Sequence, residues 1–190
     1  MHKRWMIYII VGLVFGLADW YFLEFLASFS RNPALNDAIY QSPWILQLMI
    51  VAVIVLLNYG VWLIPVIPVS IYEMRYSQSI WRAALTAMLV WSTALISYYA
   101  YYSFLLMFVG LPNLGFMLYS NHLSTSYWLE WWPPFRRVIV DQLMEWIGIP
   151  LIAGSLVGFL SAYIYKRVST KQDVNEMIEV KGTSNTASSG

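Results

Sequence analysis

Asp19 is an acidic residue inside a long apolar run, so its carboxyl group could do chemistry that its neighbours cannot. At 1.5 Å per residue it lies about 21 Å along a helix that begins near Trp5, within a hydrocarbon layer of about 30 Å. An unpaired acid at that depth costs roughly 2.5–3.5 kcal/mol. Asp19 should therefore face a bundle interior, be protonated, or pair with a donor such as Ser97, Arg136, Arg137 or a tyrosine of the third apolar run.

Asn58 and Glu24 join Asp19 in a candidate intramembrane polar site. The Asn58 amide lies near the middle of the second apolar run, where it can donate and accept hydrogen bonds across a helix contact. We favour that structural role over ligand binding, and we expect Glu24 to lie closer to water. Asp19 itself is open to two interpretations, an acid that reaches lipid headgroups and an acid on an ion or proton pathway.

Arg137, Asp141 and Glu145 recur every four residues and predict one polar helix face. Two carboxylates on one face could bind a hard cation through oxygen ligands. A salt bridge with Arg137, and the favourable interaction of acids with a helix N-terminus, explain them equally well, and we favour this structural interpretation. His122 is a poor metal candidate, because the one other histidine is His2 near the N-terminus.

The composition excludes several kinds of chemistry. The chain has no cysteine, which excludes thiolate metal sites and a cysteine nucleophile. Its two histidines suit no Ser-His-Asp arrangement, and no glycine-rich phosphate loop precedes a lysine. The net charge of +1 argues against nucleic acid as a partner. We therefore predict no catalytic, metal or cofactor site and favour a non-enzymatic role.

The elements that must position these residues are long apolar helices. Of the 190 residues, 59% are hydrophobic and 11% charged, against roughly 25% charged in soluble domains. Four apolar runs approach or exceed the ~20 residues that a membrane-spanning helix requires. Two prolines, Pro65 and Pro68, predict a kink or an end in the second run. The predicted spans are 5–26, 44–71, 83–108 and 146–165.

The segment 112–145 carries many aromatic residues and is predicted to be amphipathic and to lie at the outer membrane interface. Within 103–134 a re-entrant segment is the alternative. Pro133 and Pro134 suit the start of the final helix, where a missing N–H costs little. The sequence therefore predicts an all-α integral membrane protein, a bundle of about four transmembrane helices with an aromatic-rich interfacial segment between helices three and four.

Two glycine pairs predict close helix packing, Gly12 with Gly16 and Gly154 with Gly158. A spacing of four places each pair on one helix face, where backbones can approach closely. Gly12 and Gly158 also lie at matching depths from the inner ends of their runs. We therefore predict a direct contact between the first and fourth spans.

Basic residues predict the orientation. Seven of them (Lys3, Arg4, Arg75, Arg82, Lys166, Arg167, Lys171) flank the proposed inner ends, against three outside (Arg31, Arg136, Arg137). This bias places both termini in the cytoplasm, and we expect the cell membrane as the location. The first run exceeds a signal-peptide core and contains acids, which favours a retained span. Residues 1–167 form one bundle, and 168–190 a polar cytoplasmic tail, disordered at least from 182.

These features favour a non-enzymatic multi-pass membrane protein that acts as a subunit or accessory component of a larger membrane assembly. Its expected partners are the lipid bilayer and other membrane subunits or a second copy of itself. A small-solute or ion carrier using Asp19 and Asn58 is the alternative. A membrane-embedded enzyme is third, and it would need His122, Asp141 and Glu145 to converge.

Overall fold

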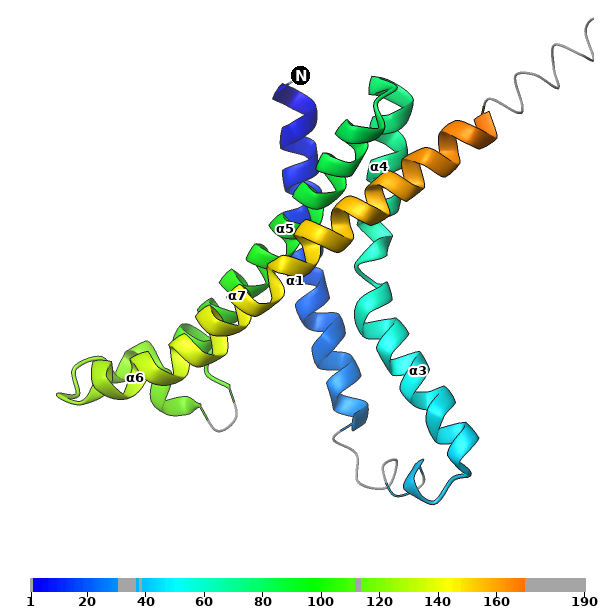
Figure 1. Cartoon of the computed structure of the whole chain (residues 1–190). Coiled ribbons are helices and arrows are strands. Elements are labelled where there is room, and N and C mark those ends of the chain that lie inside the picture. Colours follow the sequence, from blue (N-terminus) through cyan, green and yellow to red (C-terminus); the bar gives the residue numbers. More distant parts are fainter. Residues whose placement is uncertain (1, 31–36, 38, 112–113, 170–190) are drawn as a thin grey trace, which may run out of the picture.

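The computed structural model describes residues 2–30, 37, 39–111 and 114–169, which are about 89% helical and contain no strand (Figure 1). Three helices are long and apolar enough to cross a membrane, or four if one bent pair forms a single span. The elements are α1 (His2–Ser30), α3 (Trp44–Gly60), α4 (Leu63–Ser77), α5 (Ile80–Phe104), η1 (Leu105–Val109), η2 (Gly115–Met117), η3 (Tyr119–Asn121), α6 (Tyr127–Phe135), η4 (Arg136–Asp141), α7 (Gln142–Trp146), η5 (Pro150–Gly154) and a final helix over 155–169.

The second apolar run is the bent pair, α3 followed by α4, with an angle of 47° between them. The break falls at Val61 and Trp62, one turn before Pro65. The Pro65 ring would clash with the carbonyl four residues earlier, that of Val61, and Pro65 has no N–H to donate to it. The Val61 carbonyl instead accepts a hydrogen bond from Ile64, three residues on, at 3.0 Å. The bend therefore agrees with the kink predicted from the prolines.

The last helical stretch runs from Tyr127 to Ser169, 43 residues that form one apolar candidate span. It begins before Pro133 and Pro134, which lie inside α6 and do not start the helix as predicted. Residues 127–145, expected as part of a separate interfacial segment, thus continue directly into the last predicted span. Two π-helical segments interrupt the α-helix, η4 just after this proline pair and η5 at Pro150. Both segments therefore lie next to prolines, each of which removes one backbone donor from the helical hydrogen bonds.

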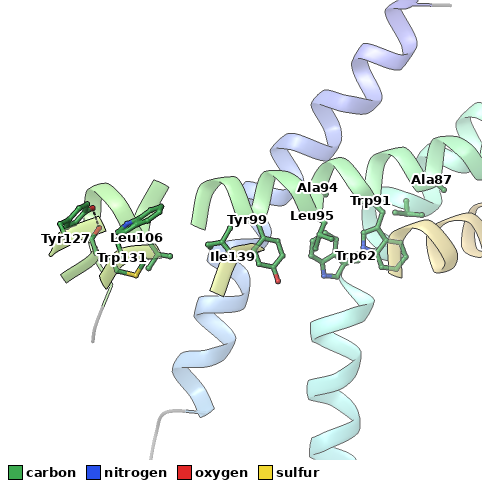
Figure 2. Packing of buried hydrophobic residues seen from close by; sticks show 12 residues of the cluster. Trp62, Ala87, Trp91, Ala94, Leu95, Tyr99, Leu106, Tyr127, Trp131 and Ile139 are labelled. Carbon is green, nitrogen blue, oxygen red and sulfur yellow. Dashed lines mark hydrogen bonds between the residues drawn. The ribbon is translucent and has the colours of Figure 1, made fainter. Parts of the chain in front are cut away.

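The central element is α5, which packs against α1, α4 and the last helix. In its apolar window 56% of residues are buried, against 22% in the corresponding windows of α1 and the last helix. Many of its buried residues are small, including Ala83, Ala84, Ala87 and Ala94. Figure 1 shows α1 and the last helix crossing α5, and Figure 2 shows the buried residues along it. Small side chains on α5 let neighbouring backbones come close.

Both glycine pairs pack on α5 rather than on each other. A Cβ added to Gly12 would lie 2.7 Å from the Val90 carbonyl oxygen, and one added to Gly16 would overlap the Ala94 carbonyl. Gly154 and Gly158 face other α5 residues, namely Met88, Trp91, Ala83, Ala84 and Ala87. The two glycine pairs therefore do not form the contact predicted between the first and fourth spans, because α5 supplies the complementary surface for each pair.

Away from the crossing the helices diverge. The start of α1, the α4–α5 turn and the end of the last helix lie at one end of the molecule, while α3 and the second half of α1 extend apart at the other (Figure 1). None of the 17 residues of α3, all of them described, is buried. The predicted tail falls outside the described residues from 170 onward, as do 31–36 of the predicted polar loop and 112–113 of the predicted interfacial segment.

Substitution of Gly16 by alanine should lower the free energy of unfolding by about 1–3 kcal/mol, because the added methyl group overlaps α5 backbone. Gly148 is the matched control: it is helical, and an added Cβ would have no atom within 4 Å apart from its chain neighbours and its own helix backbone. Gly148→Ala should be neutral or stabilising by up to about 1 kcal/mol. Reversible unfolding in mixed micelles measures both, and equal effects would contradict this packing.

Candidate functional site

A cavity of about 530 Å³ lies between α3, α5 and α7, and we call it the aromatic cavity. Six of its lining residues are aromatic, and two carry amide side chains. Cavities of this size with few polar groups are the usual form of a binding site. The lining residues are Leu23, Ile54, Val55, Asn58, Tyr59, Trp62, Trp91, Leu95, Tyr98, Tyr99, Gln142, Trp146, Ile149 and Pro150.

Stacked rings hold the walls of the aromatic cavity together. Trp62 from the α3–α4 break stacks on Trp91 of α5, with centroids 6.2 Å apart and planes 18° apart (Figure 2). Tyr59 of α3 stacks on Trp146 of α7 at 6.0 Å. Ring pairs in this range add about 0.5–1.5 kcal/mol beyond the area they bury. They connect α3, which has no buried residue, to the rest of the bundle.

Asn58 lines the aromatic cavity but does not bridge two helices as predicted. Its amide nitrogen donates to the Ile54 carbonyl at 2.8 Å, within α3 itself. This bond lies within one turn of a single helix, so the amide nitrogen is satisfied without a partner on another helix. Asn58 is half-buried, and Gln142 on the opposite wall is exposed.

Asp19 lies in a different place, against a second cavity of about 580 Å³ between α1 and the α3–α4 pair. Its side chain is 1% exposed, and neither carboxylate oxygen has a hydrogen-bond partner among the described residues. Ser97, named above as a donor, bonds the Leu13 carbonyl instead, at 2.8 Å. Glu24 is exposed and lines neither cavity. Asp19 and Asn58 therefore do not form one polar site.

The polar face predicted from Arg137, Asp141 and Glu145 is arranged differently in the structure. Asp141 pairs with Arg136 at 3.6 Å, on the exposed surface. The predicted pairing of Asp141 with Arg137 assumed α-helical spacing, in which residues four apart are neighbours. Residues 136–141 instead form a π-helix, in which bonded residues are five apart, and this brings Arg136 next to Asp141. Glu145 is exposed on α7.

His122 stacks on Tyr119, with ring centroids 4.4 Å apart, and its Nδ1 lies 2.7 Å from the carbonyl oxygen of the same tyrosine. Within the part of the chain that the structure describes, no group of three or more His, Asp or Glu side chains could hold a metal ion. His122, Asp141 and Glu145 thus form no metal centre in that part, and the arrangement that the enzyme hypothesis required is not seen.

A polar cluster that was not predicted from the sequence connects α1 to α4. The buried Glu73 carboxylate accepts a hydrogen bond from the Tyr8 hydroxyl at 2.6 Å and pairs with Arg4 at 3.4 Å. The Arg4 guanidinium also lies 3.6 Å from the ring centroid of Tyr76. Arg4 and Tyr8 are four residues apart on one helix face, and this spacing could have indicated a shared polar partner. The acid on α4 that they reach is distant in the sequence.

The lining of the aromatic cavity has two amide side chains among rings, and the lining of the other cavity includes Asp19 among apolar side chains. Comparison of the chain with protein-family models, curated proteins and solved structures found no significant match.

Removal of the Tyr8 hydroxyl should weaken the α1–α4 connection, because hydrogen bonds to charged groups contribute about 1.5–3 kcal/mol. Tyr8→Phe should lower the free energy of unfolding by about that amount. Tyr163→Phe is the control, since it deletes the same hydroxyl from an exposed ring on the last helix. Unfolding in mixed micelles compares them, and a Tyr8 variant as stable as the Tyr163 variant would contradict the role given to Glu73.

Proposed function

We propose that the protein is a non-enzymatic multi-pass membrane protein that acts as a subunit or accessory component of a larger membrane assembly. It crosses the cell membrane four times, with the bent α3–α4 pair as one span and with both termini in the cytoplasm. The observation that carries the proposal is α3, an apolar helix without a buried residue that stands apart from the bundle and leaves the aromatic cavity beside it.

The position of the basic residues supports this orientation. They flank the start of α1, the α4–α5 turn and the end of the last helix, which lie at the same end of the molecule (Figure 1). Basic residues concentrate on the cytoplasmic side of membrane proteins. An even number of crossings then leaves both termini on that side.

The chemistry of the aromatic cavity favours a protein partner over lipid alone. Asn58 and Gln142 present amides on facing walls of the cavity. Acyl chains offer such groups no hydrogen bonds, whereas serine, threonine or amide side chains on a neighbouring helix do. Tyrosine and tryptophan rings supply the broad apolar contacts that dominate protein interfaces. A transmembrane helix of another subunit, packed over the aromatic cavity, would provide both the hydrogen-bonding groups and the apolar contacts.

Substitutions at two valines on α3 can distinguish binding of a partner helix from contact with lipid. Val55 lines the aromatic cavity, while Val53 lines neither cavity, and both are about half exposed at 49% and 53%. Val55→Trp should fill the cavity and strongly reduce copurification of a partner subunit from native membranes. Val53→Trp adds the same ring to the same helix and should leave copurification unchanged. Quantitative mass spectrometry after mild detergent extraction measures both.

Absence of any stoichiometric partner from the unsubstituted protein would overturn the proposal. So would equal loss in the two variants, because the cavity would then have no special part in the association. Copurification of a second copy alone would narrow the proposal to a homo-oligomer.

A further inference from the structure

We propose that the cavity beside Asp19 is a binding site for a lipophilic amine, a monovalent organic cation whose nitrogen pairs with the Asp19 carboxylate and whose apolar body fills the space between α1 and the α3–α4 pair. The site is separate from the aromatic cavity, and the proposal stands independently of the subunit role.

The first argument is the unpaired acid. Asp19 is 1% exposed, and neither of its oxygens has a hydrogen-bond partner among the described residues. The residue lines a cavity of about 580 Å³, and its side chain must turn toward this space for the buried oxygens to meet a ligand. A buried carboxylate without partners is one of the most costly groups in a protein, and more so within a membrane. A bound cation supplies both the missing charge and the missing donor.

The second argument is the rest of the wall, which suits an organic cation and no metal ion. Phe15 and Phe22 provide rings, and Leu57 and Ile64 provide aliphatic surface. Metal cations need several oxygen ligands, and Asp19 is the single carboxylate in this lining. Aromatic faces attract organic cations instead, particularly where water is excluded. Volumes of about 300–1,000 Å³ suit ligands of drug size.

The number of N–H groups on the amine indicates which class of amine fits best. A primary ammonium carries three N–H groups, and more than one carboxylate would be needed to satisfy all of them in an apolar site. A tertiary ammonium carries one, which Asp19 alone can accept, and its substituents are apolar like the wall. We infer that substituted amines are preferred over primary ones.

Access to the site is sideways, from the surface that would face lipid. Leu56 and Ile64 line the cavity and are exposed, at 67% and 65%. An amphiphilic amine partitions into the bilayer interface with its apolar part inward, so it reaches the cavity without crossing water. This route suits a ligand with a large apolar body.

The probe is N,N-dimethyl-3,3-diphenylpropylamine, and its control is 1,1-diphenyl-4-methylpentane, in which a C–H group replaces the nitrogen. Equilibrium dialysis against the full chain in lipid nanodiscs, with empty nanodiscs subtracted, measures both. The amine should bind at least about tenfold more tightly than the hydrocarbon, the scale of a charge-assisted hydrogen bond. Equal binding of the two would overturn the proposal, since the carboxylate would then contribute nothing.

Three variants test the assignment to Asp19. Asp19→Asn keeps the shape of the side chain and should weaken amine binding about 10–100-fold. Glu24→Gln removes an acid from the same helix outside the cavity and should leave binding unchanged. Leu57→Trp keeps the carboxylate but fills the cavity, so it should also weaken binding. Amine binding to Asp19→Asn as tight as to the parent protein would overturn the proposal.

The melting temperature of each variant, measured without amine, shows whether weak binding results from poor folding. Because the parent holds an unpaired acid, Asp19→Asn should melt at an equal or higher temperature in the same nanodiscs. A lower melting temperature would show that the carboxylate already has a structural partner, and this too would overturn the proposal.

Discussion

Close approach of helix backbones at α5 is the constraint on which the rest of the structure depends. Gly12 and Gly16 bring α1 against one side of α5, and Gly154 and Gly158 bring the last helix against another. At each of these glycines a side chain would meet α5 atoms at 3.2 Å or less. Apolar burial gives little preference for one helix over another inside lipid, so such contacts decide which helices associate.

The position of Asp19 follows from this packing. Tyr8, Gly12, Gly16 and Asp19 are the buried positions along one face of α1. Because Gly12 and Gly16 hold this face against α5, Asp19, the next residue on the same face, is buried too although it is polar. At one end of this face the buried Tyr8 hydroxyl donates a hydrogen bond to Glu73, and at the other end Asp19 lies beside a cavity. The divergence of α3 also leaves space for the aromatic cavity, which α3 lines together with α5 and α7.

Local features were predictable from the sequence, and pairings between distant segments were not. The bend before Pro65 depends on one missing N–H and one ring, both within a single helical turn, so the proline predicted it. The glycine spacing identified the close-packed faces, but it could not tell which helix each face meets, because α5 has no glycine of its own to mark it. The π-helix over Arg136–Asp141 changed the neighbour of Asp141 by one residue, a shift that periodicity does not reveal.

The depth of Asp19 predicted either burial in the bundle or contact with lipid headgroups, and the structure buries it without a hydrogen-bond partner among the described residues. Every donor that the sequence suggested lies on an element whose distance from Asp19 depends on how the helices cross. Ser97 is close to α1, as its bond to Leu13 shows, yet it bonds backbone and not the acid. A depth along a helix axis can be read from the chain, whereas the direction around that axis depends on packing.

Disulfide crosslinking in native membranes tests the central role of α5 most directly, since the chain contains no cysteine of its own. A Cβ on Gly12 would lie 2.9 Å from that of Thr93, so Gly12→Cys with Thr93→Cys should crosslink on mild oxidation, detected after proteolytic cleavage between the two positions. Gly12→Cys with Gly158→Cys should remain unlinked. A crosslink between positions 12 and 158 without one between 12 and 93 would place the first and last helices against each other and contradict the account.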